Sequence, residues 1–138
     1  MALKFNNKIK LSWDDLETLV DKLCEKIPFE TPTVDSVTGI ARGGLIPAVM
    51  VSHKTGLPYV DVVGPNTLVI DDIADSGVTL QNSPGVYTAV LHYKPHTSSF
   101  KPTIWAEEHK GDEWQIYPWE KLDSIAMQDY LKEEAIYR

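Results

Sequence analysis

The sequence predicts an α/β fold, a mainly parallel sheet flanked by helices. The apolar run Leu68–Ile70 ends in two acids and a Ser/Gly/Thr segment, as a buried strand running into a helix would. Val34–Ala41 also reads as a strand, and it runs through two glycines into an apolar helix that reaches about Lys54. Val86–Tyr93 reads as a further core strand. Strands that alternate with helices in this way are typical of an α/β sheet.

The first strong helix signal precedes these strands. Ser12 reads as an N-cap with Asp15 three positions on, and Pro28 is expected to end the helix. Cys24 lies on the apolar face, which favours a buried small hydrophobe over a nucleophile. The face comprises residues at helical spacing: Trp13, Leu16, Leu19, Val20, Leu23, Cys24 and Ile27.

The stretch Leu68–Leu80 carries groups with a chemical use. Two carboxylates at the end of the strand suit sugar hydroxyls or Mg²⁺, and they are Asp71 and Asp72. Backbone N–H groups and hydroxyls beyond them suit a phosphate at a helix start, and they belong to Ser76, Gly77, Val78 and Thr79. The structural alternative is a strand that runs into an Asp-rich turn and a capped helix.

A second glycine turn, Arg42-Gly43-Gly44, lies between the strand at Val34–Ala41 and its helix, and it suggests another anion loop. Pro47 is tolerated in the first helical turn, and Gly56 is expected to end the helix. The alternative is a simple strand–turn–helix connection in which glycine relieves crowding.

Weaker signals describe the rest of the chain. The helix after the first motif is expected to be short, because Ser83-Pro84-Gly85 breaks it. The other predictions are a strand at Leu57–Val63, the short connection Gly64–Thr67, a strand at Thr103–Ala106, an acidic loop at Glu107–Glu113 and a helix over residues 123–137.

Composition limits the possible classes of protein. A chain of 138 residues predicts one domain, residues 1–138, and its net charge of −7 argues against nucleic acid as the main partner. No apolar run is long enough to cross a membrane. The single Cys24 excludes an internal disulfide and fits a reducing cytoplasm.

Two motifs together carry a family resemblance. Leu68–Thr79 resembles the phosphoribosyl-pyrophosphate (PRPP) binding motif of the type I phosphoribosyltransferases: an apolar run, two acids, a short spacer and a phosphate loop. Gly39–Ala48 resembles the pyrophosphate loop of the 6-oxopurine enzymes, most of all the xanthine-guanine phosphoribosyltransferases. In that family the peptide at the position of Arg42–Gly43 is often cis.

The resemblance implies a role for each matching residue. Asp75 would be the acid/base at purine N7, Lys94 would donate to the 6-oxo group, and Trp114 would stack on the base. The backbone at Trp114 and Gln115 would read the 2-position of the base. Arg42 and Gly43 would hold pyrophosphate, residues 75–79 the 5-phosphate, and Asp71, Asp72 and Glu120 would serve Mg²⁺.

The implied function is Mg²⁺-dependent transfer of 5-phosphoribosyl from PRPP to a 6-oxopurine in purine salvage. The resemblance also implies a small lid built from the terminal segments and a homo-oligomer, either a dimer or a tetramer. The chain departs from the family at Gly64–Thr67, where a long mobile loop is missing. This departure keeps open a PRPP-binding regulator or catalytically weakened homologue. A transferase for another base, such as a pyrimidine, is disfavoured by Lys94 and Trp114.

Overall fold

The computed structural model describes residues 3–5, 7–83 and 85–121. Two compact units are present, one spanning Val20–Lys110 and a smaller one that combines Met1–Leu19 with the segment from Gly111 onward. Among the described residues, no helix combines the length and the apolar character needed to cross a membrane.

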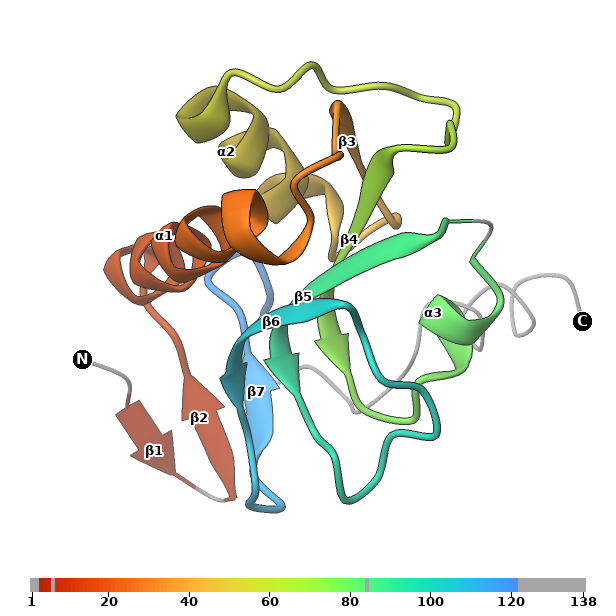
Figure 1. The fold of residues 1–138 in the computed structure, drawn as a ribbon. Coiled ribbons are helices and arrows are strands. Elements are labelled where there is room, and N and C mark those ends of the chain that lie inside the picture. Colours follow the sequence, from red (N-terminus) through yellow and green to blue (C-terminus); the bar gives the residue numbers. More distant parts are fainter. Residues whose placement is uncertain (1–2, 6, 84, 122–138) are drawn as a thin grey trace, which may run out of the picture. The chain divides into compact units, whose positions relative to one another are not determined.

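The larger unit contains a parallel sheet. Its strands are β3 (Ser36–Gly39), β4 (Thr67–Ala74), β5 (Tyr87–Tyr93) and β6 (Ile104–Glu108), arranged side by side in that order (Figure 1). Every neighbouring pair runs parallel. The two central strands are apolar and almost entirely buried, as expected for a sheet covered on both faces. The predicted α/β fold with a mainly parallel sheet is confirmed.

Helices connect and cover the strands. Helix α2 (Leu45–Thr55) packs on β3 and β4 and ends at Gly56, whose φ of 79° is left-handed, as predicted. Helix α3 (Val78–Gln81) is as short as expected.

Helix α1 (Trp13–Glu30) begins with the predicted capping box. The Ser12 N–H donates to Asp15 Oδ2 at 2.8 Å, and the Asp15 N–H donates to Ser12 Oγ at 3.0 Å. Its predicted end at Pro28 is wrong by two residues, because the proline lies inside the last turn. The Thr31 N–H still donates to the Ile27 carbonyl at 2.9 Å, which closes that turn around the proline.

The smaller unit contains a sheet of three strands, β1 (Leu3–Phe5), β2 (Lys8–Lys10) and β7 (Trp114–Ile116). β1 and β2 are antiparallel, and β2 pairs parallel with β7. The described parts of the terminal segments thus form a small unit of their own. The helix predicted over residues 123–137 lies outside the described residues.

The predicted strand at Leu57–Val63 is wrong. One residue, Tyr59, forms a bridge opposite Val37. The Val37 N–H donates to the Pro58 carbonyl and the Val60 N–H donates to the Val37 carbonyl, both at 2.9 Å. Pro58 has no N–H to extend the ladder, and the Val62 side chain is 81% exposed, so apolar burial does not hold the segment to the sheet.

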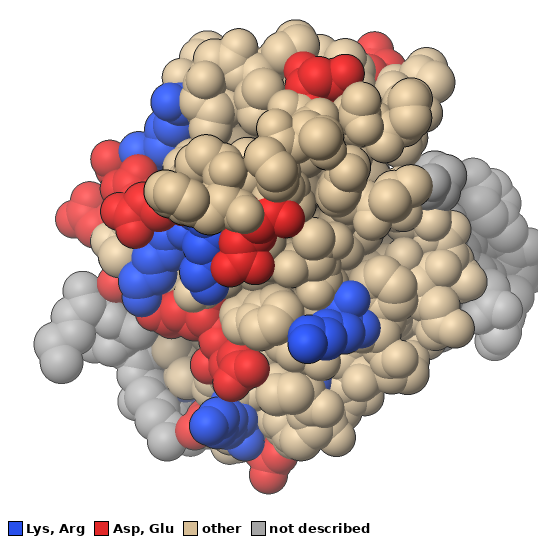
Figure 2. All heavy atoms as spheres, in the orientation of Figure 1, with Lys and Arg blue, Asp and Glu red and all other residues tan. Residues whose placement is uncertain are grey.

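The predicted acidic loop at Glu107–Glu113 is also partly wrong. Its first two residues continue β6, because Glu107 pairs with His92 and Glu108 with Tyr93 of β5. The surface over α1 and β6 mixes basic and acidic side chains (Figure 2), and Lys22 forms an ion pair with Glu107 there. This face therefore offers no continuous basic surface to a polyanion.

Candidate active site

The candidate site lies at the carboxyl ends of the parallel strands in the larger unit. The turn from Arg42 follows β3, the segment 75–79 follows β4, and Lys94 follows β5 directly. Because parallel strands end at the same edge of a sheet, three segments far apart in sequence meet there (Figure 1). Ligands of open α/β sheets bind at this edge.

The turn after β3 packs against the acids of β4. A Cβ added to Gly43 would lie 2.1 Å from Asp72 Oδ2, and one added to Gly44 would lie 2.2 Å from the Ile70 carbonyl oxygen. Gly44 therefore has no room for a side chain against the backbone, and a side chain at Gly43 would have to displace the Asp72 carboxylate. The side chain of Arg42 is exposed. The predicted anion loop after β3 thus lies against the paired acids of β4.

The peptide bond expected to be cis is displaced by one residue. The cis bond joins Ala41 to Arg42, whereas the resemblance placed it between Arg42 and Gly43. The sequence shows no proline at this turn that would have marked the position.

Asp71 and Asp72 each accept a hydrogen bond from the backbone N–H of the residue that follows. Asp71 is buried and its Oδ1 accepts the Asp72 N–H at 2.9 Å. Asp72 Oδ1 accepts the Ile73 N–H at 2.7 Å. Both residues lie inside β4 as the structure defines it, short of the end at Ala74. These bonds orient both carboxylates, and that of Asp72 lies beside Gly43.

No group of three or more His, Cys, Asp or Glu side chains within the described part of the chain is placed to hold a metal ion. Two carboxylates are nevertheless enough for Mg²⁺ that arrives with a substrate, because this ion keeps several waters and commonly binds one or two carboxylates plus phosphate oxygens. The donor set therefore fits a substrate-borne Mg²⁺.

The predicted phosphate loop turns at Gly77, where φ is 83°. A Cβ at Gly77 would lie 2.5 Å from Ser98 Oγ and 2.7 Å from the Phe100 nitrogen. The Val78 N–H donates to Ser76 Oγ at 3.3 Å, and Thr79 lies in the first turn of α3. The loop is therefore compact, and a segment beyond β5 is packed directly against it.

That segment, residues 97–100, is bonded to the phosphate loop. The Ser99 N–H and hydroxyl donate to the Ser76 carbonyl at 2.9 and 3.0 Å. The Thr97 hydroxyl lies 2.8 Å from both the carbonyl oxygen and Oδ1 of Asp75. The only sign of these contacts in the sequence is the group of hydroxyl side chains soon after Lys94.

Asp75 and Lys94 face each other. Lys94 Nζ lies 3.8 Å from Asp75 Oδ2, and the lysine side chain is 5% exposed. A lysine at the end of a strand is usually solvated, whereas a buried ammonium beside a carboxylate is typical of a functional site. Lys94 is therefore buried rather than a solvated residue at the end of a strand.

Trp114, Gln115 and Glu120 belong to the smaller unit. The Trp114 N–H donates to the Asn7 carbonyl at 2.9 Å, and Gln115 is buried in β7. Glu120 Oε1 accepts the Tyr117 N–H at 2.9 Å, so this carboxylate closes a local turn. Trp119 stacks on Tyr117 with ring centroids 5.1 Å apart, so this tryptophan packs against a neighbouring ring.

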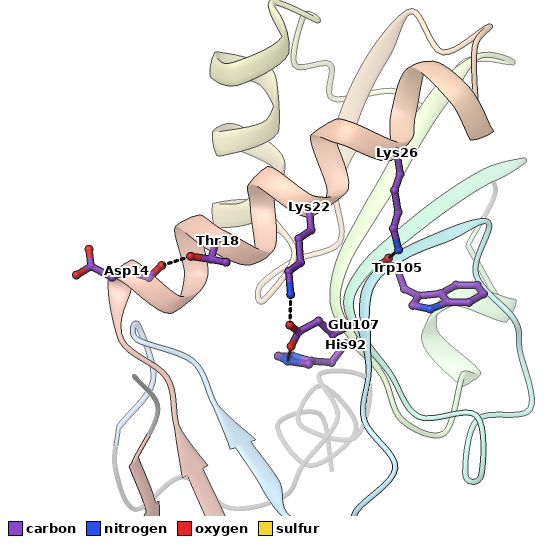
Figure 3. A network of polar contacts seen from close by, with 7 residues as sticks. All are labelled: Asp14, Thr18, Lys22, Lys26, His92, Trp105 and Glu107. Atoms are coloured by element: carbon purple, nitrogen blue, oxygen red, sulfur yellow. Dashed lines mark hydrogen bonds and ion pairs between the residues drawn. The ribbon is translucent and has the colours of Figure 1, made fainter.

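A separate polar network lies between α1 and the β5–β6 pair (Figure 3). Glu107 bridges Lys22 and His92, whose Nε2 lies 3.8 Å away, and Lys26 donates to the Trp105 carbonyl. Burial lowers the pKa of His92 to about 4, although Glu107 opposes this shift. Cys24 is half-buried, and burial raises the pKa of its thiol, so it is a poor nucleophile at neutral pH.

Comparison with known proteins agrees with this arrangement. No family model matches the chain. A xanthine-guanine phosphoribosyltransferase of Cereibacter sphaeroides is 26% identical over 145 residues, covering 80% of this chain and 85% of that one. The solved purine phosphoribosyltransferase of Pyrococcus horikoshii is 25% identical with a TM-score of 0.69, covering 88% of this chain and 99% of that one. A hypothetical protein of Neisseria gonorrhoeae, solved with bound ppGpp, is 24% identical with a TM-score of 0.62, covering 99% and 100%.

The parallel sheet and these solved neighbours define the type I phosphoribosyltransferase fold. Sequence similarity adds the branch of that class. The chain is a phosphoribosyltransferase homologous, at low identity, to the xanthine-guanine phosphoribosyltransferases.

Proposed function

We propose that the protein transfers 5-phosphoribosyl from PRPP to N9 of a 6-oxopurine, namely guanine, xanthine or hypoxanthine, and releases pyrophosphate in purine salvage. The carrying observation is the pair formed by Asp75 and Lys94, with Oδ2 and Nζ 3.8 Å apart. The pair presents an acceptor beside a donor. A 6-oxopurine with a proton on N7 presents the complementary donor and acceptor along one edge.

The proposed reaction breaks one bond at ribose C1 and forms another. The bond from ribose C1 to pyrophosphate breaks, and its electron pair leaves with the pyrophosphate. The bond from C1 to N9 forms, and the N7 proton moves to the Asp75 carboxylate. Lys94 holds the 6-oxo oxygen throughout and orients the base.

The remaining residues hold PRPP. Asp71 and Asp72 take the ribose hydroxyls, directly or through metal-bound water, and Arg42 with Gly43 takes pyrophosphate. Residues 75–79 take the 5-phosphate, with backbone donors gathered by the turn at Gly77. The Val78 N–H donates to Ser76 Oγ at 3.3 Å, a long bond that a phosphate oxygen readily replaces.

Mg²⁺ would be held by Asp71 and Asp72 together with the substrate, and when bound it neutralises charge on the leaving pyrophosphate. Glu120 would serve a second ion once it exchanges its bond to the Tyr117 N–H. Trp114 would stack on the base, and the backbone at Trp114 and Gln115 would read its 2-position. We expect a dimer or tetramer, as the resemblance implies.

The test is incubation with Mg²⁺, PRPP and each nucleobase, with chromatographic detection of nucleotide. The Lys94 ammonium is a hydrogen-bond donor, and the 6-amino group of adenine is a donor as well, so the two do not pair. Adenine should therefore react at least about 100-fold more slowly than a 6-oxopurine. Comparable rates on adenine would contradict the assignment of Lys94. A parallel incubation with EDTA should abolish synthesis.

A second candidate is a PRPP-binding regulator without turnover. The segment 57–66 favours this candidate. The segment is short and joins the sheet at one bridge, whereas the family carries a long closing loop at this place. The chain is also similar over nearly its full length to the Neisseria gonorrhoeae protein solved with bound ppGpp. Calorimetric titration with PRPP and with ppGpp tests this candidate. Binding of either ligand, together with no nucleotide in the synthesis assay, would favour it.

A further inference from the structure

We propose that Thr97 is a positioning residue, which fixes the Asp75 carboxylate so that Oδ2 alone meets the purine. The inference rests on the proposed transfer reaction, and it adds a residue outside the motifs that carry the family resemblance. Thr97 follows Lys94 by three positions in the segment that closes against the phosphate loop.

The contacts of one hydroxyl carry the argument. Thr97 Oγ1 lies 2.8 Å from Asp75 Oδ1 and 2.8 Å from the Asp75 carbonyl oxygen. A hydroxyl has one proton, so the two oxygens share it. Because both acceptors belong to one residue, rotation of the Asp75 side chain breaks one contact and keeps the other. The hydroxyl thus restrains the rotamer of Asp75 relative to its own backbone.

The two carboxylate oxygens then have different surroundings. Oδ1 accepts the Thr97 hydroxyl, whereas Oδ2 faces Lys94 Nζ at 3.8 Å. An oxygen already engaged by a donor is a weaker proton acceptor than its partner. The proton from N7 is therefore directed to Oδ2, the oxygen beside the lysine that holds the 6-oxo group.

Thr97 is not needed to anchor its own segment. The Thr97 and Ser98 N–H groups donate to the Lys94 carbonyl at 3.2 and 2.9 Å, and Ser99 bonds to the Ser76 carbonyl through both its N–H and its hydroxyl. Removing the Thr97 hydroxyl leaves all of these bonds in place. A structural role alone therefore predicts little effect from its removal.

The experiment compares Thr97→Val, which keeps the shape and loses the hydroxyl, with Thr97→Ser, which keeps it. Ser99→Ala is the matched control, because it removes a hydroxyl from the same segment that does not touch Asp75. For Thr97→Val we expect kcat for guanine to fall roughly 10- to 100-fold, a part of the 10²–10⁴-fold that acid/base catalysis supplies. KM for PRPP should stay within about twofold, and Thr97→Ser and Ser99→Ala should stay near wild type.

A second measurement does not depend on turnover. The ¹³Cγ resonance of Asp75, assigned by its loss in Asp75→Asn, should move in Thr97→Val and stay in Thr97→Ser and Ser99→Ala. An unmoved resonance together with an unchanged kcat would overturn the proposal. If the wild-type protein makes no nucleotide, the proposed function fails, and the resonance still decides whether Thr97 restrains Asp75.

Discussion

In the proposed reaction, the carboxylate of Asp75 accepts the proton from purine N7. Its carboxylate is 20% exposed, with Thr97 on one oxygen and Lys94 near the other. The partial burial limits access by water and leaves room for a base to approach. Neither neighbour is near Asp75 in sequence, so the environment of this carboxylate follows from the parallel order of β4 and β5.

Replacing Asp75 by Asn keeps the shape of the side chain and removes its capacity to accept a proton. We expect kcat to fall by about 10²–10⁴-fold, the usual contribution of a general acid/base. The affinity for PRPP, measured by calorimetry, should change little, because we propose that backbone groups hold the 5-phosphate. A kcat near the wild-type value would reduce Asp75 to a residue that shapes the loop.

The turn that follows β3 packs directly against strand β4. Gly43 lies against Asp72, and Gly44 lies against the carbonyl of Ile70. Neither close approach can be seen in the sequence, because it depends on the register in which Gly39 pairs with Ile70. Prediction from sequence therefore identified the glycine turn and the paired acids but could not identify their contact.

Gly43→Ala tests that contact. A methyl group 2.1 Å from Asp72 Oδ2 must displace the carboxylate or the turn. We expect KM for PRPP to rise about tenfold or more, equivalent to roughly 1.4 kcal/mol of lost binding. Steady-state kinetics measure this.

The matched control is Gly64→Ala, where the nearest atom to an added Cβ is 3.4 Å away. This variant should bind PRPP like the wild type. Melting temperatures of both variants exclude a general loss of fold, and equal KM values in the two would remove the link between the turn and the acids.

Sequence reasoning succeeded and failed for identifiable reasons. The capping box at Ser12 and the left-handed Gly56 are local, so their residues specify them. The strand predicted at Leu57–Val63 was wrong, because its apolar residues do not face a core and Pro58 cannot extend a ladder. The segment containing Thr97 has no local pattern, since its partners lie in another loop.

At the scale of the whole molecule, His92 links stability to pH. Its side chain is 5% exposed, and its pKa is about 4 in the folded protein against 6.5 for an ordinary histidine. The groups that face it are Glu107, His109, Lys94 and Lys22. Because the unfolded state binds the proton more readily, stability is complete above pH 6.5 and declines as the pH falls toward 4.

We therefore expect the free energy of unfolding to fall by up to about 3 kcal/mol across that window. Urea denaturation at a series of pH values measures it. In His92→Gln the slope between pH 6.5 and 4 should be shallower than in the wild type. His96→Gln removes an exposed histidine and should retain the wild-type slope; identical slopes in all three proteins would rule out His92 as the source.

Coupling between PRPP cleavage and nucleotide formation is the other property of the whole molecule. No long loop follows Val60, so a flap of the family kind cannot come from the segment 57–66. We expect slow synthesis with measurable pyrophosphate release from Mg²⁺-PRPP when no base is present. Release assays with and without guanine measure the leak. Tight coupling would instead indicate that the segment 97–100 or a neighbouring subunit shields the reacting carbon.

The small sheet has a consequence for how the chain is made. β2 pairs with β7, so Lys8 lies opposite Trp114, about 100 residues later. At about 5–20 residues per second, a ribosome needs roughly 5–20 s after it has synthesised β2 to synthesise its partner β7. During that time one edge of β2 presents unpaired backbone groups to every other nascent chain nearby. The charges of Lys8 and Lys10 on this strand discourage edge-to-edge association until β7 has been synthesised.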